Sequence, residues 1–277
     1  MQSGIYDNID INQYHKDAAI SSTGINLILD CPQKYYYEYH VKPAELTAKE
    51  IEKENAKYKI GRAVHLYVLE PYRFDDTFYS LKEPVNLTTK AGKEVWAQAE
   101  VEAKGRLILR DNEYEEIMEI SNAVAKHSIW NKLTDGQAEQ SIFWEDGVYN
   151  TPLKARPDIF NKHLILDIKT TQDIKMFMKS IYTYGYHIQA AMQIDALKQL
   201  DGKKRNFAFF VVERKAPYLT ACFVLDEKAI EYGRLQYLDG AALYTECVNT
   251  NKWNGYAEDF QLISLPKWVY ENNQSYV

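Results

Sequence analysis

The stretch Lys154-Ala-Arg-Pro-Asp158-Ile-Phe-Asn-Lys-His-Leu-Ile-Leu-Asp167-Ile-Lys169-Thr-Thr decides the fold of this chain. It predicts a β-hairpin whose second strand is buried, because apolar residues alternate from Leu164 onward with a set that includes Asp167 and Lys169. The side chains of a strand point alternately to its two faces, so Asp167 and Lys169 share one face.

The expected turn brings a second acid to that face. If Asn161-Lys162 is a two-residue turn, Asp158 pairs with Ile165 and lies diagonally across from Asp167, roughly 7 Å away. Two carboxylates at this distance can share a divalent cation, with a lysine one step further along the strand. This arrangement is typical of a metal-dependent phosphodiesterase.

Two structural interpretations compete with a metal site. One is a solvated strand face with surface ion pairs. The other is a structural salt bridge, because the same register places Arg156 opposite Asp167. The apolar run Leu164-Ile-Leu166 argues against both, since it marks a central strand in which unpaired acids are costly.

The composition is that of a globular protein with ample length for a full core. Of 277 residues, 46% are hydrophobic and 26% are charged, which fits one large domain or two small ones. The first residues have neither a basic end nor an apolar stretch, so we expect no signal peptide. The longest apolar run, residues 207–212, is too short to cross a bilayer, so we expect no membrane association.

Cysteine content and charge narrow the function classes further. Cys31, Cys222 and Cys247 are scattered and cannot supply a four-cysteine site, so we expect no iron–sulfur cluster and a reduced, cytoplasmic protein. The net charge of −6 argues against broad coating of nucleic acid. A negative net charge is still compatible with an enzyme that confines its positive charge to a DNA channel. Basic clusters occur at 203–205, 214–215 and 175/179, and each of them is typical of a solvated surface.

The chain has no repeat and no linker-like segment, so we expect one domain over 1–277, with a mainly helical part at 1–130 and a β-sheet core at 138–250. Residues 33–40 are expected to be helical or extended, and 43–57 a mobile loop or exposed helix. Further helices are expected over 21–30, 58–70, 88–104, 110–130, from 173, and over 186–200 and 226–249. Strands are expected over 139–145, in the hairpin, and over 205–213 and 219–225. The predicted class is α/β, a central mixed β-sheet flanked by helices.

Three more side chains are candidates for the same site. His65, in the helical Gly61-Arg-Ala-Val-His65, is either a packed or surface histidine or an additional metal ligand. Glu139 heads the first expected strand and either binds metal, holds a metal-bound water or is exposed. Gln189, on the helix after the hairpin, either contacts a phosphate, orients a catalytic side chain or lies on the surface.

The order of these motifs along the chain resembles that of the PD-(D/E)xK nuclease superfamily. The motifs are G-x-x-x-H, then E, R-P-D, D-I-K and Q. Within its RecB-type branch, the chain looks most like the RecE-like (exonuclease VIII-like) phage and prophage exonucleases. The segments Ile20-Ser-Ser-Thr-Gly, Cys31-Pro-Gln-Lys-Tyr-Tyr and Leu69-Glu-Pro71 are similar to that family as well. The resemblance covers about residues 15–225, and its specificity comes from the ordered set of motifs.

The resemblance implies a restriction-endonuclease-like core and a role for each candidate. His65, Asp158 and Asp167 would be metal ligands, Lys169 the catalytic lysine and Glu139 an accessory acid. Gln189 matches the glutamine of the Q-x-x-x-Y motif, but Gln193 stands at the tyrosine position, with Tyr186 as a steric substitute.

It also implies a reaction and its partners. The cofactor would be Mg²⁺ or Mn²⁺, and the substrate linear double-stranded DNA, degraded 5′ to 3′ to leave a 3′ strand for a RecT-like annealing partner. The oligomer would be a ring, with four subunits. Two alternatives stay open: an endonuclease of the same fold, and a DNA-binding module without catalysis. The tail from Trp253 to Val277 is expected to be an oligomer contact or a lid.

Overall fold

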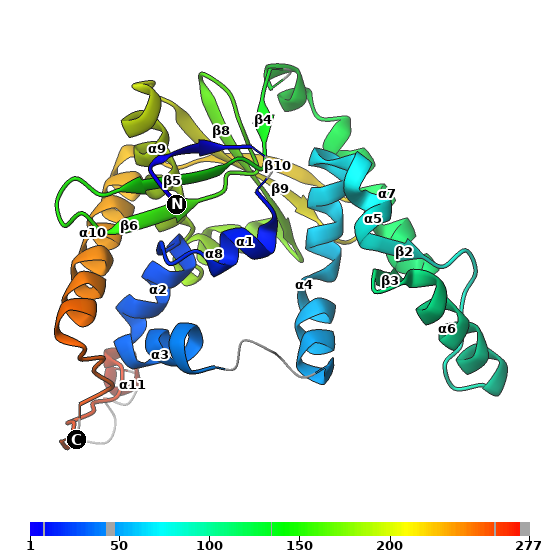
Figure 1. Ribbon diagram of the computed structural model, residues 1–277, viewed down its shortest axis with the longest axis horizontal. Coiled ribbons are helices and arrows are strands. Elements are labelled where there is room, and N and C mark those ends of the chain that lie inside the picture. The colour runs from blue at the N-terminus through cyan, green and yellow to red at the C-terminus, as the bar shows by residue number, and fades with distance from the viewer. Residues whose placement is uncertain (8, 43–47, 134, 258, 272–277) are drawn as a thin grey trace.

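The computed structural model describes residues 1–277 except 8, 43–47, 134, 258 and 272–277. The described residues form three sheets, and helices surround the central one (Figure 1). The central sheet has the strand order β10-β9-β8-β7-β4, and only β8 and β9 run parallel. Its strands are β4 (Gln137–Ala138), β7 (Ile159–Phe160), β8 (Leu164–Thr171), β9 (Asn206–Glu213) and β10 (Thr220–Val224). The expected mixed α/β class with flanking helices is therefore confirmed.

The second sheet has the order β1-β5-β6, and all its pairs are antiparallel. Its strands are β1 (Gly4–Tyr6), β5 (Ser141–Glu145) and β6 (Pro152–Ala155). A third, two-stranded sheet pairs β2 (Phe78–Ser80) with β3 (Leu107–Leu109) in parallel. The sequence analysis missed β1, β2 and β3, each of which is only three residues long.

The helices flank both faces of the central sheet. Those described are α1 (Ile11–Lys16), α2 (Ser22–Asp30), α3 (Pro32–Tyr36), α4 (Ala48–Leu69), α5 (Phe74–Thr77), α6 (Lys90–Ala103), α7 (Asp111–Ala125), α8 (Phe177–Thr183), α9 (Tyr186–Asp201), α10 (Glu227–Thr250) and α11 (Lys267–Glu271). A π-helical turn, η1 (Tyr37–Val41), extends α3 and agrees with the helical option for 33–40. Part of the expected loop or helix at 43–57 lies outside the described residues, and the rest begins α4.

Period-2 alternation in β8 and β9 builds two cores, one on each side of the sheet. Ile165 and Phe209 pack into the core on the side of α2, α9 and α10. Leu166 and Phe210 pack into the core on the side of α4 and α7. Because both faces are covered, an acid or a lysine in β8 points into a protein layer and not into bulk water.

One β-ribbon crosses from the small sheet into the central sheet and bends on the way. The pairing of β5 with β6 and the pairing of β4 with β7 share one register, and Glu139 N–H donates to Asp158 O at 3.0 Å between them. Glu139 has a left-handed φ of 52°, and Pro157 on the opposite strand has no N–H to donate. The expected strand over 139–145 is confirmed for residues 141–145, which form β5, whereas Glu139 and Gln140 lie in the bend between β4 and β5.

Lys154 holds the N-terminal segment against the small sheet. Its side chain is buried, and Nζ donates to Tyr14 O at 2.8 Å, to Asp17 O at 2.8 Å and to His15 O at 3.3 Å. These carbonyls lie at the end of α1, where a helix leaves its last acceptors without partners.

Replacing Lys154 with methionine should lower the free energy of unfolding by about 2–3 kcal/mol, because hydrogen bonds to a charged donor are lost and buried carbonyls are left unsatisfied. Urea denaturation followed by circular dichroism measures the change. Lys162→Met, at an exposed turn position, is the control and should stay within about 0.5 kcal/mol of the parent protein. Equal stabilities of the two variants would contradict this role.

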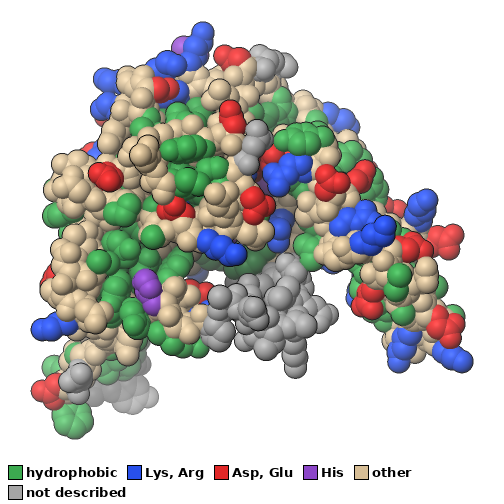
Figure 2. Space-filling model, in the orientation of Figure 1, with side chains coloured by type: hydrophobic (Ala, Val, Ile, Leu, Met, Phe, Trp, Pro, Cys, Tyr) green, Lys and Arg blue, Asp and Glu red, His purple; other side chains and the backbone are tan. Residues whose placement is uncertain are grey.

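No helix of the described chain combines the length and the apolar character that a bilayer crossing requires. The space-filling view shows acidic and basic side chains interspersed over one face of the molecule (Figure 2).

Candidate active site

The two acids of the hairpin lie directly opposite each other in the central sheet, where β7 begins beside β8. Ile159 pairs with Leu166 and Phe160 with Ile165, so the same register places Asp158 opposite Asp167. The expected diagonal pairing, with Asp158 opposite Ile165, was wrong by two residues. The turn contains four residues: Asn161 N–H donates to Leu164 O, and Asn161 Oδ1 accepts from the N–H groups of His163 and Leu164.

The salt bridge considered for Arg156 does not involve Asp167. Arg156 Nε donates instead to Glu139 Oε2 at 2.8 Å, and Nη1 donates to Ile9 O and Ser141 Oγ. The pairing of β5 with β6 explains this, because its register, continued past Ala155, places Arg156 opposite Ser141 in the bent ribbon. Asp167 is left to interact with other groups.

Asp158 occupies the point at which β7 leaves β8. It is 8% exposed, and its Oδ2 accepts from Ile168 N–H at 2.5 Å, a donor that has lost its strand partner there. His65 approaches from α4, with Nδ1 3.4 Å from the same Oδ2. Burial raises the pKa of Asp158, but the neighbouring His65 outweighs burial and the net pKa is lowered.

His65 presents a defined ring nitrogen to the carboxylates. Its Nε2 lies 2.8 Å from Ile168 O, and a carbonyl can only accept, so Nε2 carries the proton and Nδ1 is directed to the acids. A ligating histidine is commonly oriented by such a bond from its other nitrogen. Burial lowers the pKa of His65, but the Asp158 carboxylate outweighs this and raises the pKa to about 9.

Glu139 completes a cluster of three possible ligands. One ligand atom from each of His65, Glu139 and Asp158 lies within 4.8 Å of the others. Burial, together with the charge of Asp158, raises the pKa of Glu139 to about 7. The left-handed backbone at Glu139 places it here, in the bend and not in a regular strand.

Asp167 is held by a second group of residues. Its Oδ1 accepts from Gln189 Nε2 at 2.6 Å, and its Oδ2 lies 2.6 Å from Lys169 Nζ. Asp167 is 1% exposed, and burial raises its pKa despite the lysine. Gln189 comes from α9, so the helix after the hairpin positions the carboxylate of β8.

Lys169 is protonated in this environment. Burial lowers its pKa, but the Asp167 carboxylate outweighs burial and the net pKa is raised. Its Nζ also lies 3.4 Å from Gln189 Oε1 and 4.6 Å from the centre of the Tyr186 ring. The Tyr186 ring therefore lies next to the ammonium group of Lys169. This is the contact through which Tyr186 would take the place of the tyrosine in the Q-x-x-x-Y motif.

A cavity of about 260 Å³ opens beside this cluster. Glu139, Arg156, Gln189 and Gln193 line it together with residues at the start of α2. Gln193, at the usual tyrosine position, is 2% exposed, and its Oε1 has no hydrogen-bond partner among the described residues. The hydroxyl residues at the start of α2 were not predicted to line this cavity. Serine and threonine are common at helix starts because they cap the backbone, so their presence there does not indicate a site.

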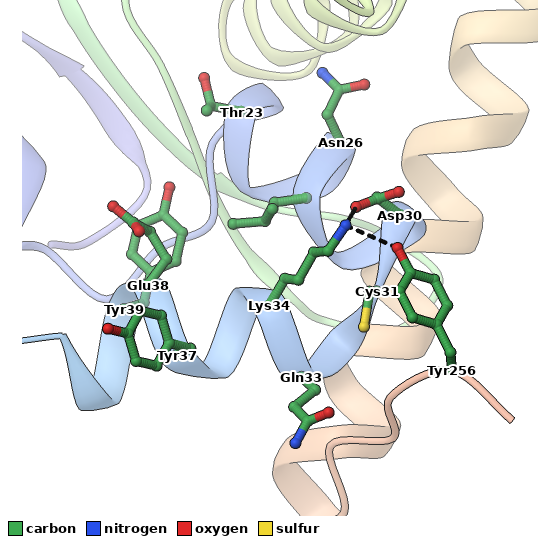
Figure 3. Close-up of a pocket in the computed structure, with 11 residues that line it drawn as sticks. Thr23, Asn26, Asp30, Cys31, Gln33, Lys34, Tyr37, Glu38, Tyr39 and Tyr256 are labelled. Carbon is green, nitrogen blue, oxygen red and sulfur yellow. Dashed lines mark hydrogen bonds and ion pairs between the residues drawn. The ribbon is translucent and has the colours of Figure 1, made fainter. Parts of the chain in front are cut away.

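A more voluminous cavity is also lined by residues of α2. It measures about 950 Å³, and α2, α3, η1 and Tyr256 form its walls (Figure 3). Lys34 Nζ lies between Asp30 and the Tyr256 hydroxyl, at 2.7 and 2.8 Å. None of the six candidate residues lines it, and Thr23 is common to both cavities.

All six residues expected from the sequence therefore come from separate parts of the fold to one site beside β8. The partly buried cluster of His65, Glu139 and Asp158 is a donor set that suits a hard divalent cation, and Asp167 lies next to it. The partly buried ammonium group of Lys169 can bind a phosphate oxygen. Together these groups fit hydrolysis of a phosphodiester.

Comparisons with known proteins identify the family and the fold of the chain. A family model described as "PDDEXK-like domain of unknown function (DUF3799)" matches residues 21–266. No curated protein matches the sequence. A crystal structure of a "putative exonuclease" from Eubacterium rectale superposes with a TM-score of 0.61 and 12% identity, covering 97% of this chain and 99% of that one. A phage related exonuclease from Haemophilus somnus gives a TM-score of 0.33 and 14% identity, covering 84% and 96%.

Proposed function

The chain belongs to the family of PDDEXK-like domains, and from this premise we propose that it is a metal-dependent exodeoxyribonuclease acting on linear double-stranded DNA. The family match agrees with the resemblance to PD-(D/E)xK nucleases in the sequence motifs. The observation that carries the proposal is the geometry at β8, where Asp167 holds Lys169 at 2.6 Å directly opposite Asp158.

Asp158, Glu139 and the Nδ1 atom of His65 are the proposed metal ligands, with Asp167 at the adjacent position. Oxygen and imidazole donors suit Mg²⁺ and Mn²⁺. A divalent ion held here would supply positive charge to the scissile phosphate and acidify a water molecule. Glu139, whose pKa burial raises to about 7 in the metal-free protein, would hold the ion directly or hold a water beside it once ionised.

Lys169 is proposed to stabilise the charge that develops on the phosphate during attack. Its raised pKa keeps it an ammonium ion, so it acts as a hydrogen-bond donor and not as the base. Asp167 and Gln189 fix its direction through their contacts with each other and with Nζ. Gln189 is therefore a positioning residue, because it acts through Asp167 and Lys169.

Metal binding should become tighter as the pH rises from about 6 to 9. A cation needs a neutral His65 and an ionised Glu139, but in the metal-free protein the pKa values are about 9 and about 7. Binding must therefore release protons, about one or more per ion at pH 7. Calorimetric titration with Mn²⁺ in buffers of different ionisation enthalpy measures this release. Affinity and heat that do not depend on pH or buffer would contradict the proposed ligand set.

The polarity of digestion and the biological role are proposed from the resemblance. We infer 5′ to 3′ removal of nucleotides from DNA ends, which leaves a 3′ single strand for a RecT-like annealing partner in recombination. The fold shared with the Eubacterium rectale protein is compatible with this inference.

Self-association, as a ring of four subunits, is proposed from the resemblance and from an apolar arm near the C-terminus. Phe260, Leu262 and Ile263 are 102%, 99% and 91% exposed, which is unusual for neighbouring large apolar residues. The arm follows Tyr256, which forms one wall of the cavity in Figure 3. That cavity offers an aromatic surface on which the arm of a second copy can pack.

Replacing Phe260, Leu262 and Ile263 together with serine should reduce the mass in solution to that of the 32.3 kDa monomer. Size-exclusion chromatography with light scattering measures it, and a variant with serine at Asp259 and Gln261 is the control. A parent protein that is monomeric, or a triple variant that keeps the parent mass, would contradict this role of the arm.

The proposed reaction is tested by measuring the degradation of linear duplex DNA labelled at either the 5′ or the 3′ end. The digestion is carried out with Mg²⁺ and with a chelator, and a covalently closed circular DNA is treated in the same way. Metal-dependent loss from 5′ ends with the circle intact is the expected result. Cutting of the circle would identify an endonuclease. Retained DNA binding without any cleavage would overturn the enzyme proposal in favour of a binding module.

A further inference from the structure

The segment between β8 and α9 exposes a group of large side chains next to the candidate active site. It runs Ile174-Lys-Met-Phe-Met-Lys-Ser-Ile-Tyr-Thr-Tyr-Gly-Tyr186. Met178 is 81% exposed, Tyr182 74% and Tyr184 61%. Residues 174–186 contain two exposed lysines and no acidic residue, in a chain whose net charge is −6. The acid that directly precedes them, Asp173, accepts from the Lys175 N–H at 2.8 Å.

Tyr184 is connected to Lys169 through a single aromatic ring. The ring centres of Tyr184 and Tyr186 are 5.7 Å apart, and Lys169 Nζ is 4.6 Å from the centre of Tyr186. Tyr186 is fixed from behind by Phe177 and Phe209 of the core, at 6.0 and 5.7 Å. The exposed ring therefore extends an aromatic row that begins at the group proposed to contact the phosphate.

The turn that carries Tyr184 is fixed by its backbone. Gly185 has a left-handed φ of 64°, and a Cβ there would lie 2.0 Å from Asn26 Oδ1 on α2. The N–H groups of Tyr184 and Gly185 donate to Ser180 O and Tyr182 O. An exposed tyrosine on a turn packed this tightly against α2 is presented to solvent in a defined place, as a ligand site requires.

We propose that Tyr184 stacks against an unpaired nucleobase of the DNA strand at the active site, and that Lys175 and Lys179 contact the backbone of that strand. This inference rests on the proposed nuclease function. Exposed aromatic rings and lysines in one surface segment are the pattern by which proteins bind single strands through base stacking and phosphate contacts. Bases inside a duplex already stack on each other, so only a base that has left the helix can lie on this ring.

The stacking geometry also predicts that the site does not distinguish one base from another. Every base has an aromatic face, so stacking on Tyr184 should tolerate all four bases. The hydroxyl group of Tyr184 has no part in stacking. Phenylalanine or tryptophan at this position should therefore preserve binding, whereas leucine, which is apolar but not aromatic, should not.

The test measures binding of a fluorescent twelve-nucleotide strand to the full-length protein in chelator, where cleavage cannot occur. Tyr184→Leu should weaken binding roughly tenfold, the effect of losing one base–aromatic stack. Tyr184→Phe should bind like the parent protein. Tyr149→Leu, at an exposed tyrosine in the turn between β5 and β6, is the control and should also bind like the parent.

A strand with abasic sites separates stacking from general effects of the substitution. The parent protein should bind the abasic strand more weakly, and Tyr184→Leu should cause no further loss on it. Equal losses on normal and abasic strands would overturn the stacking proposal, as would unchanged binding of Tyr184→Leu to the normal strand. Photocrosslinks from 5-iodouracil in the strand should map to Tyr184 or Tyr182, and crosslinks only outside 174–186 would also overturn it.

The outcomes for this inference and for the nuclease proposal can be told apart. If stacking is observed but DNA is not cleaved with Mg²⁺ or Mn²⁺, the catalytic proposal fails and the strand-binding site stands. If DNA is cleaved and Tyr184→Leu binds and cleaves like the parent protein, the nuclease stands and the stacking site fails.

Discussion

A Lys169→Met variant is expected to cleave DNA about 10²- to 10³-fold more slowly than the parent protein, the effect of removing one preorganised donor that stabilises charge in a transition state. Methionine fills a similar volume without the ammonium group, which lies 2.6 Å from Asp167 Oδ2 and is largely buried. Single-turnover digestion of end-labelled linear DNA at saturating Mg²⁺ measures the rate.

In the Lys169→Met variant, DNA binding should be affected much less than the rate of DNA cleavage. DNA affinity in chelator should change little, because Lys169 is only one of the groups proposed to contact the strand. Lys162→Met, in the exposed hairpin turn, is the matched control and should cleave at the parent rate. Parent-like cleavage by Lys169→Met would remove the lysine from the proposed mechanism.

Asp158→Asn is expected to abolish metal-dependent behaviour altogether. Asp158 lies at the centre of the cluster, near both His65 and Glu139, and its charge is maintained in the metal-free protein. Removing a ligand costs several kcal/mol of charge stabilisation, so cleavage should fall by about 10³-fold or more. Mn²⁺ should raise the melting temperature of the parent protein, because an ion that binds only the folded state stabilises it.

This rise in melting temperature should be absent in Asp158→Asn. Asp76→Asn, at an exposed position of α5, is the control and should keep both the rise and the cleavage. A variant that still gains stability from Mn²⁺ would show that Asp158 is not a ligand. A variant that loses the gain but cleaves normally would separate metal binding from catalysis.

The sequence predicts the central part of the fold because β8 carries its own pattern. Alternation from Leu164 onward identifies a strand buried on both faces and places Asp167 and Lys169 together. The register of the hairpin could not be predicted, because it depends on how Asn161 bonds to the backbone of a turn that contains no glycine. A four-residue turn shifts the pairing by two residues, so both acids stay on the same face and move closer.

Glu139 shows why one site residue was harder to place than the others. Nothing in its own segment indicates a left-handed backbone, since neither glycine nor asparagine stands there. The visible sign was on the opposite strand, where Pro157 interrupts the ladder. Similarly, β1, β2 and β3 are short strands, and β1 pairs with a partner more than one hundred residues away, so local patterns do not reveal them.

The parallel pairing of β8 with β9 has a consequence for protein synthesis. All six candidate residues precede Asn206, yet β8 is held in the sheet by β9, which pairs with it along its whole length from residue 206 to 213. A polypeptide interrupted before that point contains every side chain of the site but not the strand that orders two of them. An incomplete chain that ends before residue 206 is therefore expected not to assemble the proposed active site, which forms only after β9 has been synthesised.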